Sequence, residues 1–178
     1  MSEVELESAL LVPVPEAESY VSHHRFRYDS VALRGVPAHI TVVFPFIPPP
    51  AMTDEAVDAV RHVLTRFSAF RFRLTKLERF PEGAVYLAPE PAEPFVRLTT
   101  ELVDRFPAYP AYGGAYADVI PHLTVAQLPE VPTLDEFSDI RRSLPIQCEA
   151  REILLMVENE DHQWDMRSRF ALDGAGRT

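Results

Sequence analysis

The sequence predicts one α+β domain of two lobes related by a pseudo-twofold axis, with a cleft between the lobes. Segments typical of strands alternate with segments that carry helix-start signals, and this order of elements occurs twice. The length of 178 residues fits a single domain, so we expect one domain over residues 1–178. Each lobe is expected to contain an antiparallel sheet with flanking helices.

The first half of the chain alternates between strand and helix patterns. Residues 6–14 are apolar and end at two prolines, which is typical of a strand. Thr53 precedes two acidic residues, a favourable helix start. Phe70, Phe72 and Leu74 alternate with arginines, which predicts a strand with one buried face. We expect strands at 6–14, 38–44, 70–80 and 84–87, and helices at 16–28, 53–67 and 93–106.

The second half continues with the same kinds of pattern. The threonine and the two carboxylates of residues 133–136 predict another helix start, in a helix that ends near residue 144. Apolar segments at 121–127, 146–158 and 163–172 predict strands, the last two as a hairpin. The glycine-containing tail from about residue 173 is expected to fray.

The most informative feature of the repeat is a tetrapeptide that occurs twice. It is His39-Ile40-Thr41-Val42 in the first copy and His122-Leu123-Thr124-Val125 in the second, 83 residues later. Alternate residues of a strand share a face, so each histidine points the same way as its threonine. The aliphatic pairs can then anchor each strand in the core, while two imidazoles and two hydroxyls face the cleft.

Two imidazoles and two hydroxyls around one small volume suit phosphodiester chemistry. In-line displacement at phosphorus needs a base for the attacking oxygen and an acid for the leaving oxygen, and histidine serves either role near neutral pH. We therefore predict His39 and His122 as catalytic residues and Thr41 and Thr124 as donors to the phosphate oxygens. Neither tetrapeptide offers the second ligand that a zinc site needs, so we expect no metal and no other cofactor.

The paired His-x-Thr-x tetrapeptides resemble the signature of the 2H phosphoesterases, which include 2′-5′ RNA ligase-like proteins and cyclic nucleotide phosphodiesterases. The resemblance covers nearly the whole chain. It implies a bilobal α+β fold and metal-independent action on 2′,3′-cyclic phosphates or 2′-5′ phosphodiesters of nucleotides or RNA ends. It assigns His39 and His122 to catalysis and Thr41 and Thr124 to phosphate binding. Gln127 replaces an arginine that many ligase-like members carry, which argues against ligase activity and long RNA substrates.

Charge and composition limit the partners. The formal net charge is −10, whereas binding to long nucleic acid needs a basic surface, so only a nucleotide or a short RNA end is expected. The single cysteine, Cys148, excludes an internal disulfide, and no apolar run is long enough to span a bilayer. The N-terminal residues show no signal-peptide pattern. We expect a cytoplasmic monomer without membrane attachment.

Other functional interpretations stay open at this stage. The alternative to an enzyme is a binding module that holds a nucleotide in the same cleft without turnover; a structural repeat without a ligand is a third interpretation. His23, His24, His62 and His162 are interpreted as surface residues. Residues 109–116 contain tyrosines that suit base stacking, although a packed loop is favoured; Arg79 and Tyr86 are further candidates for the cleft wall.

Overall fold

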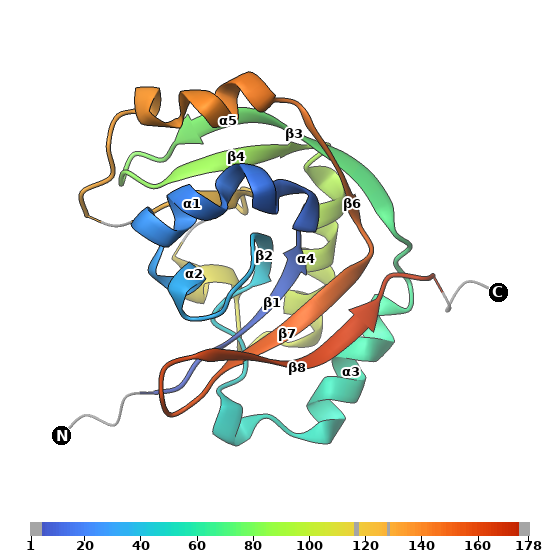
Figure 1. Cartoon of the computed structure of the whole chain (residues 1–178). Helices are drawn as coiled ribbons and strands as arrows, with labels where there is room; N and C mark the ends of the chain where they lie inside the picture. Colours follow the sequence, from blue (N-terminus) through green and yellow to red (C-terminus); the bar gives the residue numbers. More distant parts are fainter. Residues whose placement is uncertain (1–4, 116–117, 128, 175–178) are drawn as a thin grey trace.

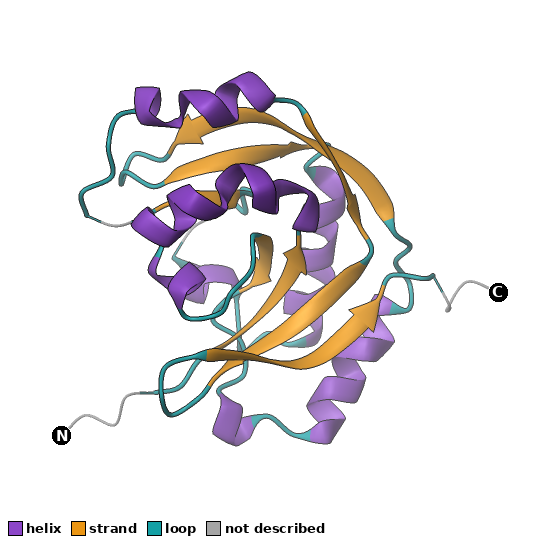
Figure 2. Ribbon diagram, in the orientation of Figure 1, coloured by secondary structure: helices purple, strands orange, loops and turns teal. Residues whose placement is uncertain are grey.

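A curled antiparallel sheet organises the protein (Figures 1 and 2). The computed structural model describes residues 5–115, 118–127 and 129–174, and within these ranges eight strands form one sheet in the order β6-β3-β4-β5-β2-β1-β7-β8. The strands are β1 (Ser8–Pro13), β2 (His39–Val43), β3 (Phe70–Arg79), β4 (Val85–Glu90), β5 (Leu123–Ala126), β6 (Ile146–Ala150), β7 (Glu152–Glu158) and β8 (Trp164–Ala171).

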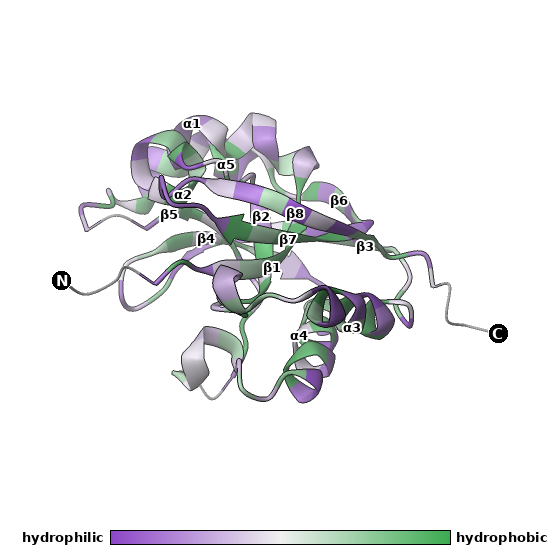
Figure 3. Ribbon diagram, turned by 90° about the horizontal axis from the view of Figure 1, so that it is seen from below, coloured by the Kyte–Doolittle hydropathy of each residue, from purple (hydrophilic) through white to green (hydrophobic). Residues whose placement is uncertain are grey.

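Helices cover both faces of this sheet (Figure 3). Helices α3 and α4 lie on one side, and α1, α2 and α5 lie on the other. The α-helices are α1 (Glu18–Tyr28), α2 (Ser30–Leu33), α3 (Asp54–Leu64), α4 (Glu93–Arg105) and α5 (Ser138–Ser143), and the 3-10 turns are η1 (Pro15–Ala17), η2 (Pro49–Ala51), η3 (Ala111–Gly114) and η4 (Leu134–Phe137). None of these helices is long and apolar enough to cross a membrane, in the part of the chain that the structure describes.

Strands β2 and β5 meet at the centre of the sheet and divide its order into two sets of four. One set is β5-β4-β3-β6 and the other is β2-β1-β7-β8, so each set combines strands from both halves of the chain. The α+β class is confirmed. The two sheets that we expected are instead joined, because β2 pairs directly with β5. The pseudo-twofold division into lobes stays a prediction.

Most of the expected elements are present with slightly different bounds, and four differences are informative. Residues 146–158 form two strands, because the chain leaves β3 at Arg151 and joins β1 in the other half of the sheet. Strand β5 begins at Leu123, so His122 directly precedes the strand. The expected helix at 133–144 is divided into η4 and α5, and α2 was not anticipated. Most of the expected frayed tail, residues 175–178, lies outside the described residues.

The alternation expected for β2 is confirmed by burial. Ile40 and Val42 are buried at 0% and 2% exposure, whereas His39 and Thr41 are partly exposed. Phe72 and Leu74 are buried in the core as expected, and Phe70 packs against it partly buried.

A hydrogen bond ties α4 to the strand that carries the first tetrapeptide. Thr99 is 3% exposed, and its hydroxyl donates to the Val42 carbonyl at 2.8 Å. The next residue, Thr100, is exposed and donates within its own helix, to the Val96 carbonyl.

We expect Thr99→Val to lower the free energy of unfolding by about 1–3 kcal/mol, because the buried Val42 carbonyl loses its donor. Thr100→Val is the matched control and should change the free energy by less than about 0.5 kcal/mol. Urea unfolding monitored by circular dichroism measures both. Equal effects of the two variants would contradict a role for the Thr99 bond.

Candidate active site

The pairing of β2 with β5 brings the two tetrapeptides together. Ile40 lies opposite Leu123 in the antiparallel register, and both are completely buried. Because antiparallel neighbours run in opposite directions, His39 comes beside Thr124, and Thr41 comes beside His122. The two histidines therefore lie on a diagonal of the pair, where residues are typically about 7–8 Å apart and their Cβ atoms somewhat closer.

Both histidines are oriented by the same local hydrogen bond. His39 Nδ1 lies 2.8 Å from the Pro37 carbonyl oxygen, and His122 Nδ1 lies 2.7 Å from the Ile120 carbonyl oxygen. A carbonyl only accepts, so each Nδ1 carries the proton and donates it. Each neutral ring consequently has its lone pair on Nε2. The residue two positions before each histidine thus sets the tautomer in both tetrapeptides.

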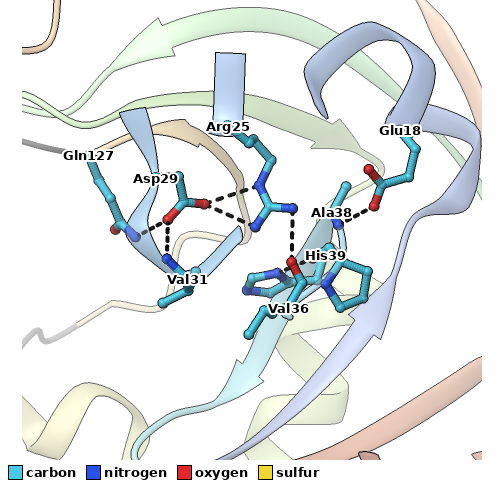
Figure 4. Close-up of polar contacts among 9 residues, drawn as sticks. Glu18, Arg25, Asp29, Val31, Val36, Ala38, His39 and Gln127 are labelled. Atoms are coloured by element: carbon cyan, nitrogen blue, oxygen red, sulfur yellow. Dashed lines mark hydrogen bonds and ion pairs between the residues drawn. The ribbon is translucent and has the colours of Figure 1, made fainter. Parts of the chain in front are cut away.

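A buried ion pair lies beside His39 (Figure 4). Arg25 of α1 and Asp29, which follows the last residue of that helix, are 2% and 1% exposed, and Arg25 Nε donates to Asp29 Oδ2 at 3.1 Å. Arg25 Nη1 also donates to the Val36 carbonyl at 3.2 Å, three residues before His39. The pair therefore connects α1 to the segment that leads into β2.

Gln127 links this ion pair to the second tetrapeptide. Its Nε2 donates to Asp29 Oδ1 at 2.7 Å (Figure 4). Its backbone N–H donates to the Tyr28 carbonyl at 2.7 Å. Asp29 thus receives hydrogen bonds from Arg25 on one side and from Gln127 on the other. Gln127 therefore helps to hold Asp29 in place. Unlike the arginine that many ligase-like proteins carry at this position, it brings no positive charge to the site.

The environment favours the neutral form of both imidazoles. Burial, reinforced by the nearby Arg25 guanidinium, lowers the pKa of His39 from 6.5 to about 4, against the raising effects of the Pro37 hydrogen bond and Asp29. Burial also lowers the pKa of His122, while the Ile120 hydrogen bond and Glu82 oppose that shift. The two histidines are therefore similar in orientation but differ in electrostatic surroundings.

A cavity of about 630 Å³ opens beside His122. Its wall includes Thr124 and Gln127 but neither His39 nor Thr41, so the cavity extends from the second tetrapeptide only. Aromatic rings surround His122: the centroid of its ring lies 4.9 Å from that of Phe80, 5.7 Å from that of Tyr86 and 6.3 Å from that of Tyr112.

The other candidates from the sequence separate into two groups. Arg79 lines the cavity, where it donates to the carbonyls of Gly83 and Pro132, and Tyr112 lines it from the loop of residues 109–116. Tyr109 instead packs against Phe46 in the core, with ring centroids 5.8 Å apart. Tyr116 lies outside the described residues.

Sequence reasoning missed Arg25 and Asp29. Their only sequence signal is a spacing of four residues on a predicted helix, which exposed ion pairs share. Nothing in the sequence distinguishes this pair from a surface pair, because its burial depends on packing between α1, β2 and β5.

One comparison with known proteins identifies the family of this chain, and a second finds a relative along nearly its whole length. A family model described as the 2′-5′ RNA ligase superfamily matches residues 13–162. A Staphylococcus aureus (strain Newman) protein, provisionally named a phosphoesterase, is 26% identical over 170 residues, which cover 91% of this chain and 96% of that protein.

Solved structures show the same fold. E. coli LigT in complex with NADP+ is similar with a TM-score of 0.59 and 15% identity, over 96% of this chain and 99% of that one. TT0787 of Thermus thermophilus is similar with a TM-score of 0.63 and 20% identity, over 94% and 98%.

The lowered pKa of His39 predicts a pH-dependent stability. The unfolded chain takes up a proton at His39 below about pH 6.5, whereas the folded chain does so only near pH 4. The contribution of neutral His39 is therefore fully present above pH 6.5 and is lost as the pH falls toward 4. Urea unfolding at a series of pH values across this range measures the effect. The free energy of unfolding should decrease less with falling pH in His39→Gln than in the original protein. Parallel curves would contradict the shift.

Proposed function

Because the chain belongs to the 2′-5′ RNA ligase superfamily, we propose that it is a metal-independent phosphoesterase of 2′,3′-cyclic phosphates or 2′-5′ phosphodiesters on nucleotides or RNA ends. Membership of this superfamily confirms the resemblance that the two tetrapeptides suggested. The observation that carries the proposal is the matched pair of imidazoles. Each is held through Nδ1 by a carbonyl two residues earlier, and each keeps Nε2 for a substrate.

In the proposed reaction, His39 is the base and His122 is the acid. Burial and Arg25 favour neutral His39 most strongly, which suits proton removal from an attacking water. Glu82 opposes the lowering of the His122 pKa, which suits proton donation to the leaving ribose oxygen. Water then bonds to phosphorus as one ring P–O bond breaks, which leaves a phosphomonoester. Each proton transfer is typically worth about 100- to 10,000-fold in rate.

Thr41 and Thr124 are proposed to donate to the non-bridging phosphate oxygens. Their hydroxyls lie one residue beyond each buried aliphatic anchor, on the same strand face as the imidazoles. Negative charge on these oxygens must be stabilised as the attacking water approaches, and neutral donors held by a sheet need no rearrangement to do so.

The cavity beside His122 is proposed to hold the nucleoside. Phe80 and Tyr112 supply aromatic surfaces on which a base can stack. Structures of E. coli LigT with 3′-AMP and with NADP+ provide a precedent for nucleotides in this fold. Gln127 is engaged with Asp29, which fits a substrate without an additional phosphate at this position.

The alternative is a module that binds a nucleotide in the same cavity without turning it over. The aromatic cavity alone would serve such a role equally well. Two imidazoles whose Nε2 atoms have no hydrogen-bond partner among the described residues favour the enzyme, because binding alone needs no paired proton-transfer groups.

We expect purified protein to convert 2′,3′-cyclic mononucleotides to monophosphates in the presence of EDTA. His39→Ala and His122→Ala should each lower kcat by about 100- to 10,000-fold, and Thr124→Val by about 100- to 1,000-fold. His62→Ala, an exposed histidine of α3, is the matched control and should retain full activity. Product is measured by chromatography. Tight nucleotide binding without product would favour the binding module.

The pKa directions also predict a bell-shaped profile of kcat/KM against pH. The rate should fall below about pH 4, where His39 becomes protonated, and should fall again with a midpoint below 6.5, where His122 loses its proton. Initial rates over a pH series measure this profile. A rate that increases continuously above neutral pH would contradict the assigned roles.

A further inference from the structure

Three ligating side chains converge where α1 meets α5. His24 Nε2 lies 3.0 Å from both carboxylate oxygens of Asp139, and His23 Nε2 lies 3.5 Å from Asp139 Oδ2. The two imidazole centroids are 3.8 Å apart, and the three ligating atoms all lie within 4.8 Å of one another. His23 is exposed as expected, but the expectation of a surface residue is wrong for His24, which is 7% exposed.

This convergence is more than one hydrogen bond requires. Successive residues of an α-helix point about 100° apart, yet the rings of His23 and His24 turn toward the same carboxylate. Asp139 already accepts a hydrogen bond from the buried His24. A second imidazole held against the first adds little to that bond, and two protonated rings this close would repel each other.

The spacing matches that of ligands around one transition-metal ion. Zinc binds imidazole nitrogen at about 2.0–2.1 Å, so two ligands of a tetrahedral ion lie about 3.3 Å apart. The distances from Asp139 to the two imidazole nitrogens, 3.0 and 3.5 Å, lie on either side of this value. We propose that His23, His24 and Asp139 form a binding site for a single zinc-like divalent ion that joins α1 to α5.

The donor set indicates the class of ion. Two imidazoles and one carboxylate suit zinc, cobalt or nickel, whereas calcium and magnesium prefer oxygen ligands throughout. The buried ring of Phe137 lies 4.9 Å from His24 and provides an apolar wall on one side. The exposure of His23 leaves the other side open, where water completes the coordination.

The proposed metal site is separate from the proposed catalytic pair of histidines. Both depend on helix α1, however, because this helix also carries Arg25. Arg25 directly follows His24 and donates to Val36 near His39. An ion bound by His23 and His24 would hold α1 on α5 and so stabilise the helix that positions Arg25. Its role is structural, and the proposed phosphoesterase reaction does not pass through it.

The test uses metal-free full-length protein titrated with Co²⁺, followed by competition with Zn²⁺. We expect one Co²⁺ per chain, with the strong visible absorption of a low-coordinate ion, and complete displacement by Zn²⁺. His23→Ala removes an exposed ligand and leaves the His24–Asp139 bond intact, so the fold should be retained. This variant should bind Co²⁺ more weakly by at least the roughly 10- to 100-fold that loss of a residue supporting a ligand typically costs. His62→Ala should bind as the original protein does.

Three results would overturn the proposal: no saturable uptake of Co²⁺, equal affinity in His23→Ala and His62→Ala, or one ion per two chains. A variant that preserves more of the cluster gives a second measurement. Asp139→Asn keeps an oxygen near His24 but removes the negative charge, and it should also weaken Co²⁺ binding while the circular dichroism spectrum stays unchanged. Phosphoesterase activity is not a readout, so failure here leaves the proposed function untouched.

Discussion

The pairing of β2 with β5 is the constraint on which the candidate site depends. A register that places Ile40 opposite Leu123 buries both aliphatic side chains and presents the histidines and threonines on the opposite face. A shift of one residue would turn the polar groups into the core and the aliphatic groups toward solvent. Packing of the aliphatic side chains in the core therefore selects the register that also aligns the imidazoles. The contacts that stabilise the fold thus also fix the relative position of the two histidines.

The two tetrapeptides are similar in sequence and in the orientation of their histidines, but their electrostatic environments differ. The buried Arg25–Asp29 pair lies beside His39, whereas His122 has Glu82 and an aromatic surround that includes Phe80. Removing either member of a buried pair would leave an uncompensated charge, so the pair is held together once α1 has packed. The imidazoles of the two tetrapeptides thus lie in different electrostatic surroundings, which suits the proposed division into base and acid.

Local patterns in the sequence were sufficient to predict the class of fold and most of its elements. They also selected the four tetrapeptide side chains, whose catalytic and phosphate-binding roles stay predictions. The doubled tetrapeptide predicted that His39 and His122 belong together, and strand alternation predicted the burial of Ile40. The division of residues 146–158 at Arg151 depends on which neighbour each strand joins, and local pattern does not report that. Burial of Arg25 and His24 depends on packing between distant segments, so each resembled an ordinary surface residue of a helix.

The order of strands also bears on how the chain folds during synthesis. The half of the sheet that contains β2 is completed by β7 and β8, which are made last. Until those strands leave the ribosome, β1 has one bare edge with unpaired backbone groups, which is prone to join other chains. The half of the sheet that contains β2 is therefore completed after the other half, whose last strand is β6. A chain that lost β7 and β8 would leave β1, the neighbour of the strand that carries His39, without its outer partner.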